Sequence, residues 1–256
     1  PLPTAQTCNA RCLGCISLQT ENNLCACQDR IAFTPTPEEI FQVSWEHIRD
    51  VNNAVVSFGQ GCEGDPLTAF EAIEPAVRMI RKKTDKGTIN LNSNAGMPER
   101  VEALCRAGLD AMRVSLNSVR PEFYQAYFRP RSYGFDDVCQ SIRTARSHGK
   151  FVAINYLNCA GFTDSQKEFD ALTAFIRNYG INMIQWRNLN FDPNQYIRIM
   201  AETGDSGKPL GMETLLAELS KRFPDLIHGY FNPPVGKKSG KRKIVRSRPR
   251  PEQTRE

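Results

Sequence analysis

The chain has 256 residues, of which 40% are hydrophobic, enough to bury the core of one main domain, and single α/β barrels commonly reach this length. No stretch approaches the roughly 20 consecutive apolar residues of a membrane span, and the start lacks a secretory pattern, which excludes a membrane protein and predicts a cytoplasmic one. The net charge of +5 suggests a nucleic-acid partner, but nine Lys and Arg against two Glu lie in residues 236–256, so the preceding residues have a net charge of −2.

Three of the nine cysteines lie close together near the start of the chain. The segment CNARCLGC spaces Cys8, Cys12 and Cys15 as C-x3-C-x2-C. Cysteine thiolates hold iron–sulfur clusters, usually four to a cubane, so three in one short loop predict a cluster with one iron left open for a substrate or cofactor. Because the motif begins so soon after Pro1, we expect a further N-terminal segment to precede it.

The segments that follow alternate between strand and helix patterns. Buried strands are expected at Ala54–Phe58, Thr88–Asn92, Ala111–Asn117, Phe151–Leu157 and Asn182–Leu189. Their recurrence at intervals of roughly 30 residues is typical of βαβ units and predicts a parallel sheet. Capping-box spacing predicts helix starts at Thr36, Thr68 and Thr163, and Pro75 predicts a kink or break in the second helix.

Polar side chains recur on one face of the expected strands, because successive side chains of a strand point to opposite faces. The set comprises Asn90, Asn92, Asn94, Arg113, Ser115, Asn117, Asn155, Gln185 and Arg187. A barrel interior packed for stability alone would carry Val, Ile and Leu there. One interpretation is that these groups satisfy one another. Their recurrence over four strands favours a polar lumen that holds a ligand and a polar substrate.

The cysteine spacing and the strands after it resemble the radical S-adenosylmethionine (radical SAM) superfamily, from about Cys8 to Asn190. The resemblance implies a partial (β/α)6 TIM-like barrel, a [4Fe-4S] cluster on the three cysteines, and S-adenosylmethionine (SAM) bound at the open iron. It also implies reductive cleavage of SAM to a 5′-deoxyadenosyl radical that abstracts hydrogen from a substrate. A donor such as a flavodoxin or ferredoxin would supply the electron. The resemblance does not identify the substrate.

Further residues are similar to parts of the superfamily's SAM site. The segment EGDP stands in place of a Gly-Gly-Glu-Pro motif, which implies that the backbone of Gly64 and Asp65 receives the methionine amino group. In RVSLNS, Ser115 and Asn117 are implied as contacts of the cofactor ribose. Arg187 ends the last expected strand, and its guanidinium geometry suits the methionine carboxylate or an anionic substrate.

Two positions depart from the superfamily pattern. Glu63 replaces the first glycine of the motif, so roles of its side chain do not carry over. Gly14 stands where many members carry an aromatic residue just before the third cysteine. The packing of adenine must then come from elsewhere in the chain.

A different interpretation is a noncatalytic iron–sulfur electron-transfer or metal-binding module. Cys25 or Cys27 would complete its four-cysteine site, and it would make no use of SAM. Cys62, in the cofactor-side turn, is a further candidate for the active site. Cys105 and Cys139 lie in helical patterns, and we expect them to pack as small apolar residues.

We expect three regions along the chain. They are a core barrel of residues 1–195, a helical extension of residues 196–235 and a basic tail of residues 236–256. The tail is rich in charge and poor in apolar residues, which predicts disorder. Such a run can bind nucleic acid nonspecifically. The interpretation as an RNA-binding protein depends on this tail alone, so a solvated tail is the simpler interpretation.

Overall fold

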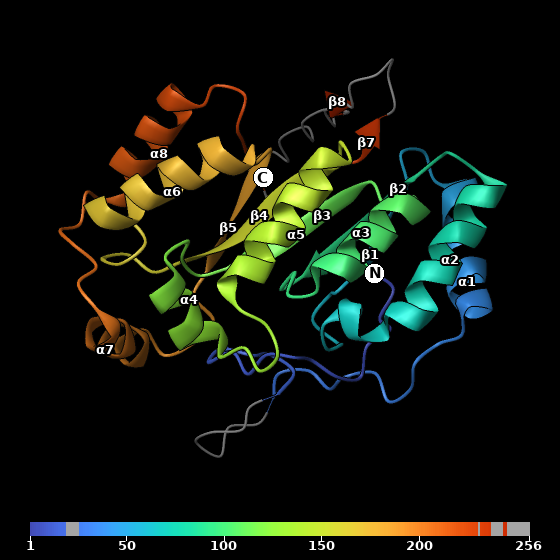
Figure 1. The fold of residues 1–256 in the computed structure, drawn as a ribbon, viewed down its shortest axis with the longest axis horizontal. Helices are drawn as coiled ribbons and strands as arrows, with labels where there is room; N and C mark the ends of the chain where they lie inside the picture. The colour runs from blue at the N-terminus through green and yellow to red at the C-terminus, as the bar shows by residue number, and fades with distance from the viewer. Residues whose placement is uncertain (19–25, 230, 237–242, 245–256) are drawn as a thin grey trace, which may run out of the picture.

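A parallel sheet of six strands forms the centre of the molecule in the computed structural model, which describes residues 1–18, 26–229, 231–236 and 243–244 (Figure 1). The strands β1 to β6 are Val55–Phe58, Thr88–Ser93, Ala111–Leu116, Phe151–Asn158, Met183–Asn188 and Ile227–Gly229. Each pairs with the next strand in the chain, and β1 and β6 remain as two edges. The sheet is therefore an unclosed, partial TIM-like barrel, which confirms the expected fold class.

Helices connect the strands and cover the outer face of the sheet (Figure 1). They are α1 (Pro37–Asp50), α2 (Phe70–Lys83), α3 (Pro98–Ala107), α4 (Pro121–Phe128), α5 (Phe135–Ser147), α6 (Gln166–Tyr179), α7 (Pro193–Thr203) and α8 (Met212–Arg222), with a short 3-10 helix, η1 (Pro66–Ala69), before α2. The helices α4 and α7 pack together at the end of the molecule along which the N-terminal segment runs (Figure 1). The loop with the three motif cysteines therefore lies at this end, against α4.

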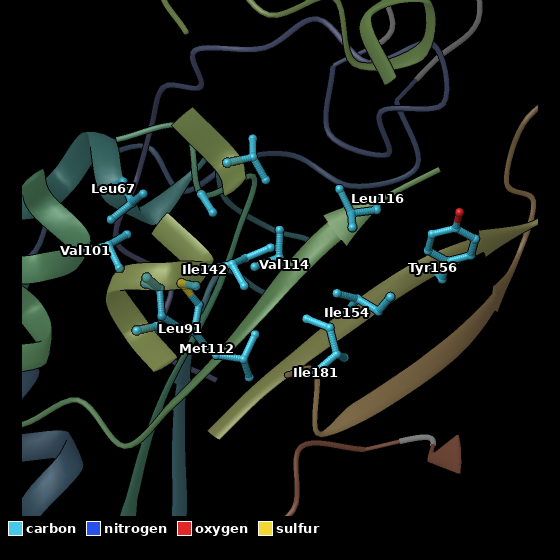
Figure 2. Close-up of a cluster of buried hydrophobic side chains, with 14 of the residues drawn as sticks. Leu67, Leu91, Val101, Met112, Val114, Leu116, Ile142, Ile154, Tyr156 and Ile181 are labelled. Atoms are coloured by element: carbon cyan, nitrogen blue, oxygen red, sulfur yellow. The ribbon is translucent and has the colours of Figure 1, made fainter. Parts of the chain in front are cut away.

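The hydrophobic core lies between the sheet and its outer helices (Figure 2). Leu91 of β2, Val114 of β3 and Ile154 of β4 are fully buried, as are Val101 of α3 and Ile142 of α5. Burying a side chain of this size stabilises the fold by about 1.5–3 kcal/mol. Because strand side chains alternate, the polar residues between these apolar ones face the opposite side, the lumen.

The predicted helix starts are confirmed at one of three positions. Thr36 caps α1 in a capping box. The Thr68 hydroxyl instead donates to two backbone carbonyls of the preceding loops, and α2 begins without a side-chain cap. The cap of α6 is Ser165, because the Thr163 hydroxyl is engaged by the backbone at the end of β4. Helix α2 continues to its end through Pro75, so the predicted break is absent.

The region expected as a helical extension, residues 196–235, contains most of α7 and all of α8, together with a strand. Strand β6 lies inside residues 196–235 and pairs with β5, and its three residues are too few to give a strand pattern in the sequence. A separate antiparallel pair joins β7 (Val235–Gly236) to β8 (Lys243–Ile244). The rest of the tail lies outside the described residues, so its disorder stays a prediction. No helix in the described ranges is long and apolar enough to cross a membrane.

Candidate active site

One cavity brings the cysteine motif together with the ends of the central strands. It has a volume of about 250 Å³ and is lined by Cys8, Cys12 and Cys15 and by Gly64 and Asp65 of the EGDP turn. We call it the cysteine cavity. Its polar lining includes Asn92, Asn94, Arg113, Ser115, Asn155 and Arg187. Residues far apart in the sequence that were selected as candidates therefore share one site.

Among the residues implied as contacts of SAM, Asn117 is the one that does not line this cavity. Strand β3 ends at Leu116, so the strand alternation that would turn Asn117 inward does not continue to it. Its side chain is fully buried, and its amide donates to the Phe123 carbonyl at 3.1 Å and to Tyr196 Oη at 3.3 Å. Asn117 therefore stabilises the connection after β3 and does not reach a ligand in the cavity.

The three motif thiols lie close enough for their charges to influence one another. Burial, with a further contribution from the Asp65 carboxylate, raises the pKa of Cys8 to about 11. Burial also raises the pKa of Cys12, and the neighbouring sulfurs of Cys8 and Cys15 act in the same direction. Thiolates are thus unfavourable here unless positive charge lies among them, and the iron of a cluster supplies such charge.

The chemistry of three thiols around one cavity fits an iron–sulfur cluster. Among the described residues, no three His, Cys, Asp or Glu side chains form a group that could hold one ion. In an iron–sulfur cluster the thiolates bind different irons, so three sulfurs can stand apart around one cavity. Cys27 is exposed and Cys62 donates to the Gln60 carbonyl at 3.2 Å, and neither lines the cysteine cavity. Cys25 lies outside the described residues.

Glu63 has a positioning role that the sequence did not reveal. Its buried carboxylate accepts hydrogen bonds from the backbone N–H groups of Thr4 (2.8 Å), Ala5 (3.1 Å), Gly59 (2.6 Å) and Gln60 (3.2 Å), and from the Thr4 hydroxyl (3.0 Å). It therefore ties the segment before the cysteine motif to the loop after β1. The only signal in the sequence was the replacement of a glycine at this position.

The EGDP turn packs directly against the start of the cysteine loop. The N–H of Gly64 donates to the Ala5 carbonyl at 2.6 Å, and that of Asp65 donates to the Thr7 carbonyl at 2.9 Å. A Cβ atom on Gly64 would lie 1.8 Å from the Thr7 oxygen, so only glycine fits without a shift of the backbone. The turn and the cysteine loop are thus held as one unit.

The Asp65 side chain connects this unit to the end of β2. Its carboxylate accepts hydrogen bonds from Ser93 Oγ at 2.8 Å, from the Asn94 N–H at 2.7 Å and from the Leu67 N–H at 3.0 Å. Burial nevertheless raises the pKa of Asp65 to about 6. The carboxylate is therefore fully used within the protein and fixes the turn in place.

The polar groups on the β1–β2 side of the lumen satisfy one another. Asn90 Nδ2 donates to Ser57 Oγ at 2.8 Å, and Asn92 Nδ2 donates to Ser57 Oγ at 3.0 Å and to the Phe58 carbonyl at 2.7 Å. Asn232, after β6, also donates to Ser57 and so reaches across from the other edge of the sheet. On this side of the lumen, the interpretation that the polar groups satisfy one another is therefore correct.

The β3–β5 side of the lumen differs, because polar groups there lack partners. Asn155 Oδ1 and Arg113 Nε are buried without a hydrogen bond in the described part of the chain. Arg113 donates from Nη1 to Gln185 and makes no ion pair there. Buried polar groups normally find partners. The polar groups on this side therefore do not satisfy one another as those on the β1–β2 side do.

Aromatic rings reach the cysteine cavity from α4 rather than from position 14. Tyr127 and Phe128, at the end of this helix, line the cavity. A Cβ atom on Gly14 would lie 2.7 Å from Tyr127 Oη, so a larger residue at Gly14 would displace the tyrosine. Asn190 Nδ2 holds the Gly14 carbonyl at 2.7 Å. Position 14 thus carries no aromatic side chain, and the aromatic ring beside it belongs to Tyr127.

Comparison with known proteins agrees with the fold. The model of the Radical SAM superfamily matches residues 2–175. The GTP 3′,8-cyclase of Aquifex aeolicus (strain VF5) is 30% identical over 177 residues, covering 69% of this chain and 52% of that protein. Streptococcus suis SuiB bound to S-adenosylmethionine gives a TM-score of 0.58 at 14% identity, over 89% of this chain and 49% of that one. A radical SAM methyltransferase from Sphaerobacter thermophilus gives a TM-score of 0.53 at 17% identity, over 78% of this chain and 59% of that one. The chain spans about half the length of the relatives it matches.

Proposed function

This chain belongs to the radical SAM superfamily, whose cofactors are an iron–sulfur cluster and SAM, and on that basis we propose that it cleaves SAM reductively at a [4Fe-4S] cluster on Cys8, Cys12 and Cys15. The supporting observation is the single cavity that these thiols share with the EGDP turn and the polar strand ends. Bound there, the cofactors would supply a 5′-deoxyadenosyl radical that abstracts hydrogen from a substrate. We further propose that the enzyme is cytoplasmic and that it receives electrons from a donor such as a flavodoxin or ferredoxin.

In this proposal the chain's own residues hold and orient the cofactors. The backbone of Gly64 and Asp65 receives the methionine amino group, and Ser115, which lines the cavity, reaches the ribose. Tyr127 and Phe128 offer aromatic surface against the adenine and keep water out. The protein thus contributes orientation and exclusion of solvent, while the radical chemistry belongs to the cofactors.

The proposal for the substrate is limited to a polar molecule. The relatives are named for different reactions, a cyclisation of GTP in one case and a methyl transfer in another. A shared fold does not choose among reactions. The support for a polar substrate is the lining of the lumen, in which asparagine and arginine side chains replace aliphatic ones.

Anaerobic reconstitution with iron and sulfide, followed by reduction with added SAM, tests this function. We expect 5′-deoxyadenosine, measured by chromatography, and its loss in a triple Cys8→Ala, Cys12→Ala and Cys15→Ala variant. Cys27→Ala is the matched control, because this exposed cysteine does not line the cavity. A stable cluster on the three cysteines that yields no 5′-deoxyadenosine would contradict the proposal and favour an electron-transfer module.

A further inference from the structure

Arg113 of β3 and Arg187 of β5 face the lumen at the junction of two cavities. Both line the cysteine cavity, and both line a second cavity of about 620 Å³ that none of the motif cysteines lines. On the intervening strand β4, Ala153 pairs with Arg113. Its short side chain leaves room for the Arg113 guanidinium to extend across β4 to Gln185. The two arginines therefore lie between the cofactor side and the second cavity.

Neither arginine is neutralised within the described part of the chain. Arg113 is only 8% exposed, its Nε has no hydrogen-bond partner, and its one side-chain contact is the neutral Gln185. The carboxylates that line the cysteine cavity, Glu63 and Asp65, are engaged by backbone and hydroxyl donors instead. A buried charge is normally paired. The lumen therefore carries positive charge without a protein counterion at this point.

The two positive charges also act on each other. Burial, and to a smaller extent the charge of Arg187, lowers the pKa of Arg113 to about 10. Because both groups are positively charged, an anion bound by both would reduce this repulsion.

We propose that Arg113 and Arg187 bind an oxyanion of the substrate, a phosphate or a pair of carboxylates, at the junction of the two cavities. This inference rests on the proposed function and narrows its substrate to an anionic molecule. Guanidinium groups match phosphate and carboxylate geometry and keep their charge at any physiological pH. The second cavity has room for the rest of the substrate, since small-molecule sites measure about 300–1,000 Å³.

SAM itself carries a carboxylate, so the cofactor is the competing source of an oxyanion. Two features favour the substrate. Two guanidinium groups match a doubly charged group, whereas SAM offers one carboxylate. Both arginines also line the second cavity, which lies beyond the motif cysteines. The two sources make opposite predictions for competition with SAM.

Anaerobic isothermal titration calorimetry on the reconstituted protein, without reductant, tests the site with inorganic phosphate and malonate as probes. We expect at least one probe to bind with saturating SAM present. Arg113→Gln and Arg187→Gln should each weaken that binding by about tenfold or more, the loss of a charged hydrogen bond. Arg177→Gln is the matched control, because it removes the same charge from the exposed surface of α6 and should leave binding unchanged.

Three outcomes overturn the inference: neither probe binds, SAM displaces the bound probe, or both arginine variants bind it like the wild type. Displacement by SAM would assign the arginines to the cofactor carboxylate. Arg187 is exposed, so its variant remains informative if Arg113→Gln fails to fold. Because the titration involves no turnover, a chain that binds the probe but forms no 5′-deoxyadenosine would contradict the proposed function alone.

Discussion

At the scale of single residues, Glu63 shows how a departure from a family pattern can be structural. A glycine at this position could not supply the carboxylate that accepts five hydrogen bonds from Thr4, Ala5, Gly59 and Gln60. Several donors around one negative charge stabilise it more strongly than they would a neutral amide. The side chain therefore fixes the cysteine loop relative to β1.

Glu63→Gln should lower the free energy of unfolding by about 1–3 kcal/mol. The amide nitrogen of glutamine is a donor, and it would face N–H and O–H donors without accepting a hydrogen bond from them. Urea unfolding of the cluster-free protein measures the change. Glu202→Gln is the control, since Glu202 is exposed on α7 and should change stability by less than about 0.5 kcal/mol. Equal effects of the two variants would show that the hydrogen bonds of Glu63 contribute nothing.

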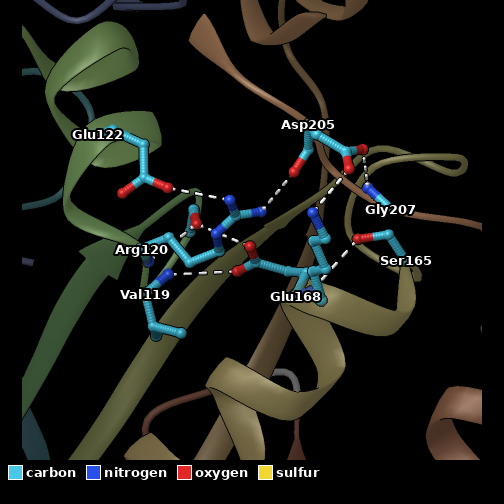
Figure 3. Close-up of polar contacts among 9 residues, drawn as sticks. Val119, Arg120, Glu122, Ser165, Glu168, Asp205 and Gly207 are labelled. Atoms are coloured by element: carbon cyan, nitrogen blue, oxygen red, sulfur yellow. Dashed lines mark hydrogen bonds and ion pairs between the residues drawn. The ribbon is translucent and has the colours of Figure 1, made fainter.

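At the scale of elements, Glu168 joins α6 to the rest of the barrel (Figure 3). Its buried carboxylate accepts from Ser118 Oγ at 2.8 Å and the Val119 N–H at 3.2 Å after β3, and from the Tyr156 hydroxyl of β4. Nearby, Asp205 accepts from Lys167 at 2.6 Å and so ties the loop after α7 to the same helix (Figure 3). These contacts fix α6 against two strands that carry the active site.

The contribution of Glu168 should depend on pH. Burial raises the pKa of Glu168 above its ordinary value, so the folded protein holds this proton more tightly than the unfolded chain does. Its stabilising contribution is then complete below about pH 4.3, the unfolded value, and is lost as pH rises through the folded pKa.

Urea unfolding from pH 4 to 7.5 should therefore show that wild type loses stability relative to Glu168→Gln as pH rises. The other titrating groups are common to both proteins and cancel in the difference. Glu202→Gln, on the exposed face of α7, makes the same replacement outside the buried network and is measured in parallel. A constant difference for Glu168→Gln as well would contradict the assigned pKa direction.

The elements that sequence reasoning located are those with a simple local cause. The strands β1 to β5 follow from patterns of buried apolar residues, and no boundary differs from the prediction by more than one residue. The caps expected at Thr68 and Thr163 fail because backbone groups outside the helices take those hydroxyls, from the distant Thr7 in one case and from the same loop in the other. Strand β6 has only three residues, and its pairing with β5, rather than its own pattern, makes it a strand.

The candidate site was predictable to the extent that it follows from spacing and alternation. The cysteine motif and the inward positions of Arg113 and Ser115 needed only the sequence. Asn117 could not be placed, because the alternation ends where β3 ends. The roles of Glu63 and Tyr127 depend on contacts between distant segments, which no local pattern encodes.

At the scale of the whole molecule, the site joins segments from both ends of the chain. The cysteine loop near the start is held by Asn190, which follows β5, through the Gly14 carbonyl. Asn232, after β6, contacts Ser57 of β1 across the open side of the sheet. A ligand bound among these segments therefore stabilises contacts that only the folded chain makes.

Loading with the cluster and SAM should consequently raise the thermal midpoint. A ligand at 100 times its Kd adds about 2.7 kcal/mol, and each kcal/mol shifts Tm by about 2–4 °C in a chain of this size, so we expect roughly 5–10 °C. Anaerobic differential scanning calorimetry of loaded and cluster-free protein measures the shift. The triple cysteine-to-alanine variant, treated with iron, sulfide and SAM in the same way, should shift by less than about 1 °C, because no thiolate holds the cluster. An equal shift in that variant would mean that the ligands bind elsewhere and that Cys8, Cys12 and Cys15 do not anchor the cofactors.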